Sequence, residues 1–204
     1  MISFALHQRS LRAQKPPRIP PNFNSKANAN AMPSEVTIRE GIPADAERLA
    51  VLATQVWLHT YATDGISSVI ARYVLSELSV SKFLDCLARE SSTILVAEID
   101  VNIVGYALVN MDVPCPSGSP MVEVASLYVQ EHFARQAIGS SLLLQSQALA
   151  LRRTGSSAIW LMVNAQNWPA IAFYQKHGLV KTGTAYFELG GEKHENLVLV
   201  SGPV

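Results

Sequence analysis

The sequence predicts a mixed α/β layer fold in one folded domain of residues 34–204. Short strands alternate with amphipathic helices along the chain, and a strand, a loop and a long helix follow one another over residues 121–153. Nearly half of the 204 residues are apolar, which is enough for one core. No apolar run approaches the roughly 18–20 residues that cross a bilayer, so we expect no contact with a membrane.

The N-terminal part has a different composition. Residues 1–34 carry five basic side chains, no acidic one and five of the eleven prolines, whereas the remainder carries eleven basic and sixteen acidic residues. A stretch this rich in Pro and Asn predicts a disordered extension over residues 1–33. Its acid-free, Arg-bearing start is typical of a targeting segment, and an upstream start codon would explain it equally well.

The first half of the domain predicts a strand, three helices and a hairpin. Residues 36–40 alternate apolar and polar side chains, and Pro43 suits the first turn of a helix. One helix face then gathers Leu49, Leu52, Ala53, Val56 and Trp57. Two further helices are expected over 65–78 and 79–90. Strands are expected over 92–100 and 102–112, where β-branched residues flank a tight turn.

The second half predicts strands and helices in alternation. A loop rich in Pro, Gly and Ser precedes a strand at 121–129, and a long helix from residue 138 ends at Gly155. Residues 157–164 are nearly all apolar, as in a strand buried on both faces. A short helix closed by Gly178 follows. Two last strands, 179–189 and 194–200, flank a Gly-Gly turn.

The two cysteines, Cys86 and Cys115, lie on unlike segments without nearby Cys or His at ligand spacing. We therefore expect neither a metal site nor a disulfide, but two reduced thiols in a cytoplasmic protein.

The start of the helix at residue 138 is a candidate anion site. A helix N-terminus presents unpaired N–H groups to phosphate oxygens, and the small residues Gly139, Ser140 and Ser141 would let a ligand approach. Arg135 adds a cation that can pair with phosphate. The alternative interpretation is an ordinary helix start.

Two segments resemble a known family. The stretch "VASLYVQEHFARQAIGSSLL" is similar to the acetyl-CoA motif of the GNAT superfamily of N-acetyltransferases, and "NAQNWPAIAFYQKHGLVKTG" is similar to its next motif. Together they span roughly residues 121–184. The resemblance implies the GNAT acyl-CoA N-acyltransferase fold, with a mostly antiparallel sheet splayed between its fourth and fifth strands and helices on both faces.

The resemblance also implies an acetyl-CoA site. Strand residues Leu127, Tyr128 and Val129 would contact the pantetheine arm, together with Asn167 and Tyr174. The pyrophosphate would be surrounded by Arg135, Gln136, Ala137, Ile138, Gly139 and Ser140. Ala137 replaces a family glycine, which is tolerable if its φ is negative, and we expect a lower affinity as a result.

Aminolysis of a thioester needs a polarised carbonyl, a proton for the thiolate and a base for the amine. The amide of Leu127 or Tyr128 would polarise the carbonyl, and Tyr174, with an ordinary pKa of about 10, would donate the proton. The alternative for Tyr174 is a core aromatic. Glu123, expected on the same strand face as Ala125 and Leu127, is the candidate base, or else a carboxylate at a solvated strand end.

Two histidines are weaker candidates for the site. His132 is expected to be a solvated loop residue, and His177 to serve packing or capping near a helix C-terminus.

A Trp-x-x-Thr-Tyr helix at residues 57–61, an Ile-Trp-Leu strand at 159–161 and a Phe-x-x-Gly segment at 187–190 resemble a bacterial subgroup of polyamine N-acetyltransferases. This finer resemblance implies a small cationic acceptor such as spermidine. Ala125 and Ser126 depart from that subgroup, which usually carries a carboxylate and a basic residue there. Acetylation of a peptide N-terminus or an amino acid, and a non-catalytic acetyl-CoA-binding domain, are the alternatives. A homodimer is compatible with the sequence, and the scattered basic charges of the tail do not predict a nucleic-acid partner.

Overall fold

The structure, a computed structural model, describes residues 35–202, so the expected extension over residues 1–33 lies outside the described residues. Its centre is a seven-stranded sheet in the order β1-β2-β3-β4-β5-β7-β6, in which only the β4–β5 pair is parallel. The strands are β1 (Val36–Glu40), β2 (Ser92–Ile99), β3 (Asn102–Asn110), β4 (Glu123–Val129), β5 (Trp160–Asn164), β6 (Leu179–Leu189) and β7 (Glu192–Ser201).

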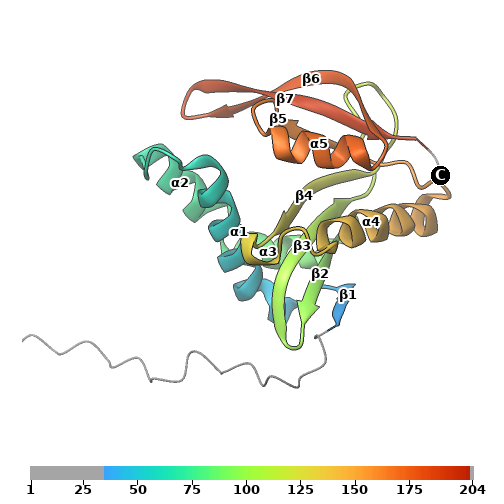
Figure 1. Ribbon diagram of the computed structural model, residues 1–204, viewed down its shortest axis with the longest axis horizontal. Coiled ribbons are helices and arrows are strands. Elements are labelled where there is room, and N and C mark those ends of the chain that lie inside the picture. The colour runs from blue at the N-terminus through green and yellow to red at the C-terminus, as the bar shows by residue number, and fades with distance from the viewer. Residues whose placement is uncertain (1–34, 203–204) are drawn as a thin grey trace, which may run out of the picture. The chain divides into compact units, whose positions relative to one another are not determined.

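Helices cover both faces of the sheet (Figure 1). On one face lie α1 (Ala46–Tyr61), α2 (Ser68–Glu77) and α3 (Val80–Ala88), preceded by the short 3-10 helix η1 (Pro43–Asp45). On the other lie α4 (Ile138–Thr154), preceded by η2 (Glu131–Phe133), and α5 (Trp168–Lys176). The predicted mostly antiparallel sheet with helices on both faces is therefore confirmed.

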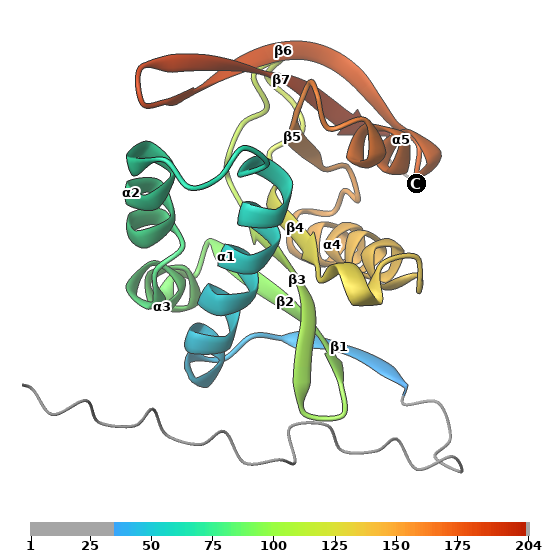
Figure 2. The ribbon, with the colours of Figure 1, turned by 60° about the vertical axis from the view of Figure 1, so that its left-hand side comes forward.

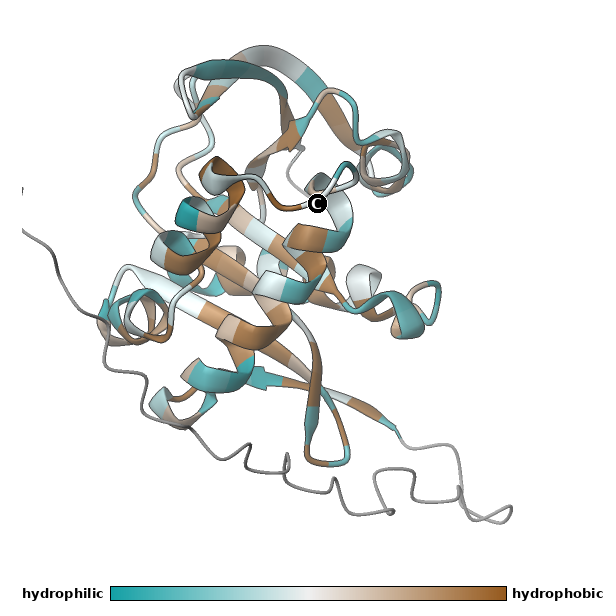
Figure 3. Ribbon diagram, turned by 90° about the vertical axis from the view of Figure 1, so that its left-hand side faces the viewer, coloured by the Kyte–Doolittle hydropathy of each residue, from teal (hydrophilic) through white to brown (hydrophobic). Residues whose placement is uncertain are grey.

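The central strands are buried on both sides, which explains their nearly continuous apolar sequences. In β2, Leu95 and Ala97 pack in the core beneath α4, whereas Ile94 and Val96 pack beneath α1 and α3. Figure 3 shows these strands as apolar along much of their length. Within residues 35–202 no helix has the length and apolar character to cross a membrane.

An ion-pair network around the buried Asp45 fixes the start of α1 against the sheet. The fully buried carboxylate of Asp45 accepts hydrogen bonds from Arg39 at 2.7 and 3.0 Å, from Arg48, and from the Ile42 amide at 2.8 Å. Arg39 also donates to Glu98 of β2 at 2.6 and 2.9 Å. The hydrogen bond from Arg39 is the main reason why the pKa of Asp45 is lowered to about 2.

Candidate functional site

The sheet opens between β4 and β5. The two strands pair at a single position, Glu123 with Trp160, where the Trp160 amide donates to the Val122 carbonyl at 2.9 Å. By contrast, β3 and β4 are paired from Gly105–Val129 to Asn110–Glu123. Figure 2 shows β5, β7 and β6 diverging from the rest of the sheet. Beyond Glu123, β4 therefore has a strand on one edge only.

The register of β4 decides which of its backbone groups face this opening. In an antiparallel pair, alternate residues direct their N–H and C=O groups to the partner strand. The Gln130 amide donates to the Val104 carbonyl at 2.9 Å, so Tyr128, two residues earlier, also bonds β3. Leu127 and Val129 then direct their backbone groups to the opening. Of the two amides considered for polarising a carbonyl, this geometry favours Leu127 over Tyr128.

A bulge in β4 corrects the predicted orientation of Glu123. The register shifts between Leu108 and Val109, leaving Ala125 without a partner. The alternation is therefore displaced by one residue, and Val124 packs in the same core as Leu127. Glu123 lies on the opposite sheet face from Leu127, contrary to the prediction. Its carboxylate, at the closed end of the opening, accepts a hydrogen bond from the Asn110 side chain at 3.0 Å.

The turn before α4 has an unusual backbone. Arg135 and Ala137 both adopt positive φ, 61° and 62°, in the left-handed region. The first hydrogen bond of the helix runs from the Ser141 amide to the Ala137 carbonyl at 2.9 Å. The three residues between them, 138–140, therefore have N–H groups that are not used in hydrogen bonds within the helix. Turns that contain left-handed residues gather amides into anion-binding concavities, so this turn fits a phosphate group.

The side chains of the turn differ in burial. Arg135, Gln136 and Ala137 are exposed, Gly139 and Ser140 are half-buried, and Ile138 is 2% exposed within the core. Ile138 can therefore offer a ligand its backbone only. The condition under which Ala137 would be tolerated without cost, a negative φ, is not met. A left-handed alanine costs about 1 kcal/mol, and the free protein already bears that cost.

Tyr174 and Asn167 stand on α5 near the opening. Tyr174 is 8% exposed, and burial, followed by the proximity of Tyr61, raises the pKa of its hydroxyl above the ordinary value assumed from the sequence. Asn167 caps α5, because its side-chain oxygen accepts from the Ala170 amide at 3.2 Å. The Asn167 side chain also lies beside the Tyr61 hydroxyl of α1, where burial raises the pKa of that hydroxyl and Asn167 partly lowers it.

An aromatic cluster, not predicted from the sequence, joins α1 and α2 to the β6–β7 hairpin. Trp57 contacts Tyr61 and Tyr73, with ring centroids 5.1 and 4.9 Å apart, and Tyr73 meets Phe187 edge-on at 5.7 Å. We call these four residues the aromatic wall. The spacing of Trp57 and Tyr61 on one helix could have indicated it, but Phe187 lies more than a hundred residues away.

His177 has a more specific position than packing or capping alone. Its Nδ1 lies 2.8 Å from the Phe173 carbonyl one turn earlier in α5, and its Nε2 lies 2.9 Å from the Ser140 hydroxyl at the start of α4. His132, in η2, is exposed as expected.

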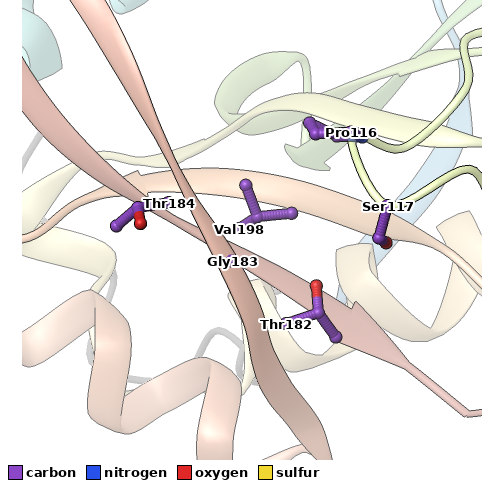
Figure 4. Close-up of a pocket in the computed structure, with 6 residues that line it drawn as sticks. All are labelled: Pro116, Ser117, Thr182, Gly183, Thr184 and Val198. Carbon is purple, nitrogen blue, oxygen red and sulfur yellow. The ribbon is translucent and has the colours of Figure 1, made fainter.

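A shallow hollow of about 190 Å³ lies elsewhere, between the 113–120 loop and the strands β6 and β7 (Figure 4). None of the predicted site residues lines it. Its lining consists of Pro116, Ser117, Thr182, Gly183, Thr184 and Val198. Within the described part of the chain, no three His, Cys, Asp or Glu side chains are grouped so that they could hold a metal ion.

Together, the opening and the turn suit one extended ligand. The free edge of β4 can hydrogen-bond an amide-bearing arm, the amides before α4 can bind an anionic group, and the Tyr174 hydroxyl can donate a proton.

Comparison with known proteins gives a family match. The model of the acetyltransferase (GNAT) family matches residues 57–179. An uncharacterized N-acetyltransferase of Mycobacterium tuberculosis is 30% identical over 157 residues, which is 76% of this chain and 96% of that protein. An N-alpha-acetyltransferase of Sulfurisphaera tokodaii is 28% identical over 130 residues, 60% of this chain and 75% of that protein.

Solved structures show the same fold. The PaiA N-acetyltransferase of Thermoplasma acidophilum, in complex with coenzyme A, superposes with a TM-score of 0.68 at 22% identity, covering 82% of this chain and 98% of that one. The ribosomal-protein-S18-alanine N-acetyltransferase of Escherichia coli superposes with a TM-score of 0.60 at 16% identity, covering 83% and 94%.

Proposed function

The chain belongs to the acetyltransferase (GNAT) family, and from that premise we propose that residues 34–204 form one catalytic domain that transfers the acetyl group of acetyl-CoA to a primary amine. The amine attacks directly, within a ternary complex. The observation that carries the proposal is the divergence of β4 from β5 beside the left-handed turn at α4. It supplies a free strand edge next to an anion-binding helix start, which matches the pantetheine and pyrophosphate of coenzyme A.

The described residues fit that co-substrate. Backbone groups of Leu127 and Val129 face the opening and suit the pantetheine amides, and Tyr128 between them contributes its side chain to the opposite face. The turn from Arg135 to Ser140 would bind the pyrophosphate, mainly through amides, with the exposed Arg135 as the counter-charge. Asn167 lies at the start of α5, and its side chain is already engaged in capping the helix.

The chemistry follows from what each group can do. Acetyl-CoA supplies an acyl group activated as a thioester. The Leu127 N–H would stabilise the negative charge that develops on the carbonyl oxygen. Tyr174 stays protonated at neutral pH because burial raises the pKa of its hydroxyl, so it is poised to protonate the departing thiolate.

The base is proposed to be Glu123, acting through water. Its carboxylate lies at the closed end of the opening and is oriented by Asn110, which in turn accepts a hydrogen bond from Ser92 at 2.9 Å. Glu123 lies at the narrow end of the opening, where β4 and β5 pair through Glu123 and Trp160. A water molecule would therefore carry the proton from the amine to the Glu123 carboxylate.

For the acceptor we propose a small cationic amine such as a polyamine. The aromatic wall supports this, because aromatic faces attract ammonium groups and pack against their alkyl chains. The acidic surplus of residues 35–204 agrees, as it favours the approach of a cation. A peptide N-terminus is the second candidate, favoured by the relative named an N-alpha-acetyltransferase.

The experiment that tests the function is thiol release from acetyl-CoA with a panel of polyamines, amino acids and peptides, with mass detection of the product. We expect release with at least one amine and the highest kcat/KM with a polyamine. A preference for peptide N-termini would replace the proposed acceptor with the second candidate. No release with any amine, despite tight binding of acetyl-CoA, would overturn catalysis.

A further inference from the structure

His177 joins two elements that are distant in the sequence. It follows the last helical residue of α5, and its imidazole bridges the Phe173 carbonyl of that helix and the hydroxyl of Ser140, 37 residues earlier, in the first turn of α4. The two contacts measure 2.8 and 2.9 Å. Both lie within the ordinary range for hydrogen bonds.

The chemistry of the two partners assigns the protons. A carbonyl oxygen only accepts, so Nδ1 of His177 carries the hydrogen and donates to Phe173. In the neutral ring Nε2 is then the acceptor, and the Ser140 hydroxyl donates to it. The hydroxyl of Ser140 is therefore directed toward α5. The Ser140 amide, which precedes the first helical hydrogen bond, is left for a ligand.

An apolar contact accompanies this bond. The Phe173 ring lies 4.4 Å from the His177 ring, and a Cβ added at Gly139 would lie 3.4 Å from Phe173 Cζ. The first turn of α4 at Gly139 therefore packs against the Phe173 ring of α5, at a separation that would give an added Cβ an ordinary van der Waals contact. Tyr174 belongs to the same helical turn, with its ring 5.2 Å from that of Phe173.

We propose that His177 is a positioning residue, which ties the helix that carries Tyr174 to the turn that binds the pyrophosphate. The inference rests on the proposed function, since it assigns to His177 the placement of the proton donor. It follows from the topology: β4 and β5 pair only at Glu123 and Trp160, so sheet hydrogen bonds do not fix α5 against α4 at the open end. The His177–Ser140 bond supplies a directional link there.

Matched variants separate the two bonds of the imidazole. His177→Asn places a donor where Nδ1 lies, so it can keep the contact to Phe173 but cannot reach Ser140. His177→Gln extends far enough to restore the link. Ser140→Ala removes the link from the other end, and Gln145→Ala is the control, an exposed residue of α4 outside the site.

The expected result is a change in kcat without a matching change in binding. His177→Asn and Ser140→Ala should each lower kcat about three- to tenfold, the effect of one hydrogen bond. His177→Gln should recover most of the rate, and Gln145→Ala should leave it unchanged. The Kd for coenzyme A, measured by calorimetry, should change less than twofold in His177→Asn. Combining His177→Asn with Ser140→Ala should add nothing further, because the two changes remove one bond.

Two further readouts decide the role. In the Tyr174→Phe background, His177→Asn should no longer lower kcat. Nitrogen-15 NMR of the imidazole should show a hydrogen on Nδ1 and an Nε2 resonance that shifts in Ser140→Ala. Full additivity of the His177 and Ser140 changes, or an undiminished effect of His177→Asn in Tyr174→Phe, would overturn the inference.

Failure of the proposed function gives a different pattern. If Tyr174→Phe itself leaves turnover unchanged, the acid role is lost, and so is the placement of the proton donor by His177. A His177–Ser140 double-mutant cycle on thermal stability, together with the NMR shift, would still establish whether the link exists.

Discussion

The Asn167 side chain lies beside the hydroxyl of Tyr61 while its oxygen caps α5. Because the oxygen accepts from the Ala170 amide, the amide nitrogen is the group available to Tyr61. This contact joins α1, which packs on β2 and β3, to the start of α5, which follows β5. It therefore connects elements from the two sides of the opening.

Two substitutions of Asn167 separate these contacts. Asn167→Asp keeps a good helix cap but removes the donor to Tyr61, whereas Asn167→Ala removes both. We expect Asn167→Ala to lose about 1 kcal/mol of stability, or about 2–4 °C in Tm, and Asn167→Asp to lose less. Thermal unfolding followed by circular dichroism measures the difference. Equal losses in the two variants would show that the cap contributes little.

Ala137→Gly should stabilise the protein. Alanine at φ 62° is strained by about 1 kcal/mol, and glycine adopts this conformation freely. The greater chain entropy of glycine offsets about 0.4–1 kcal/mol of that strain, so we expect a net gain of up to about 0.5 kcal/mol. The KM for acetyl-CoA should change less than twofold, because the turn already has its binding conformation. Ala134→Gly, at φ −63°, is the control and should not stabilise. A matching gain in both variants would contradict strain at Ala137.

Tyr174→Phe should lower kcat about a hundredfold, within the range for general acid catalysis, with a nearly unchanged Kd for acetyl-CoA. Tyr186→Phe, at an exposed tyrosine, should have no effect. Unaltered turnover in Tyr174→Phe would leave Tyr174 with a core role only.

The pH dependence of stability follows from the buried Tyr174 hydroxyl. Its pKa is raised in the folded state, so its contribution to stability is complete below about pH 10, the ordinary value for tyrosine, and is lost as the pH rises further. Urea unfolding at pH 8 and pH 11 should show a smaller alkaline loss of stability in Tyr174→Phe than in the unmodified chain.

Asp45→Asn should be destabilising, by about 1.5–3 kcal/mol, because Arg39 and Arg48 would lose their charge-assisted hydrogen bonds to Asp45 while they keep Glu98 as a partner. The pKa of Asp45 is lowered to about 2, so its contribution is present above about pH 4 and declines as the pH falls toward 2. Urea unfolding at pH 7 and pH 3 tests both statements. Asp64→Asn, at an exposed position, should change stability by less than 0.5 kcal/mol or so.

Phe187→Ala should raise the KM for a cationic acceptor about tenfold, since it removes one face of the aromatic wall. The KM for acetyl-CoA should stay within twofold. Tyr186→Ala, next to it on the exposed side of β6, is the matched control. Steady-state kinetics with each substrate varied in turn makes the comparison, and equal effects of the two variants would argue against the wall as the acceptor site.

Local patterns determined most of the fold. The helix expected over 138–153 runs from Ile138 to Thr154, and Gly155 ends it in the left-handed conformation, as predicted. Apolar periodicity and glycine stops act within a few residues, so they can be recognised without knowing what packs against the element. The family motifs, likewise continuous in sequence, placed the candidate turn and Tyr174.

Long-range packing decided the rest. A bulge at Ala125 turned Glu123 to the other face of the sheet, and the backbone of the 134–137 turn gave Ala137 a positive φ. The pairing of Phe187 with Tyr73, and of His177 with Ser140, depends on helices and strands that meet only after the sheet is assembled. By itself the sequence determined the elements and the family, because those signals are local. Only the tertiary structure decided which side chains share a face or a bond, because those contacts join residues distant along the chain.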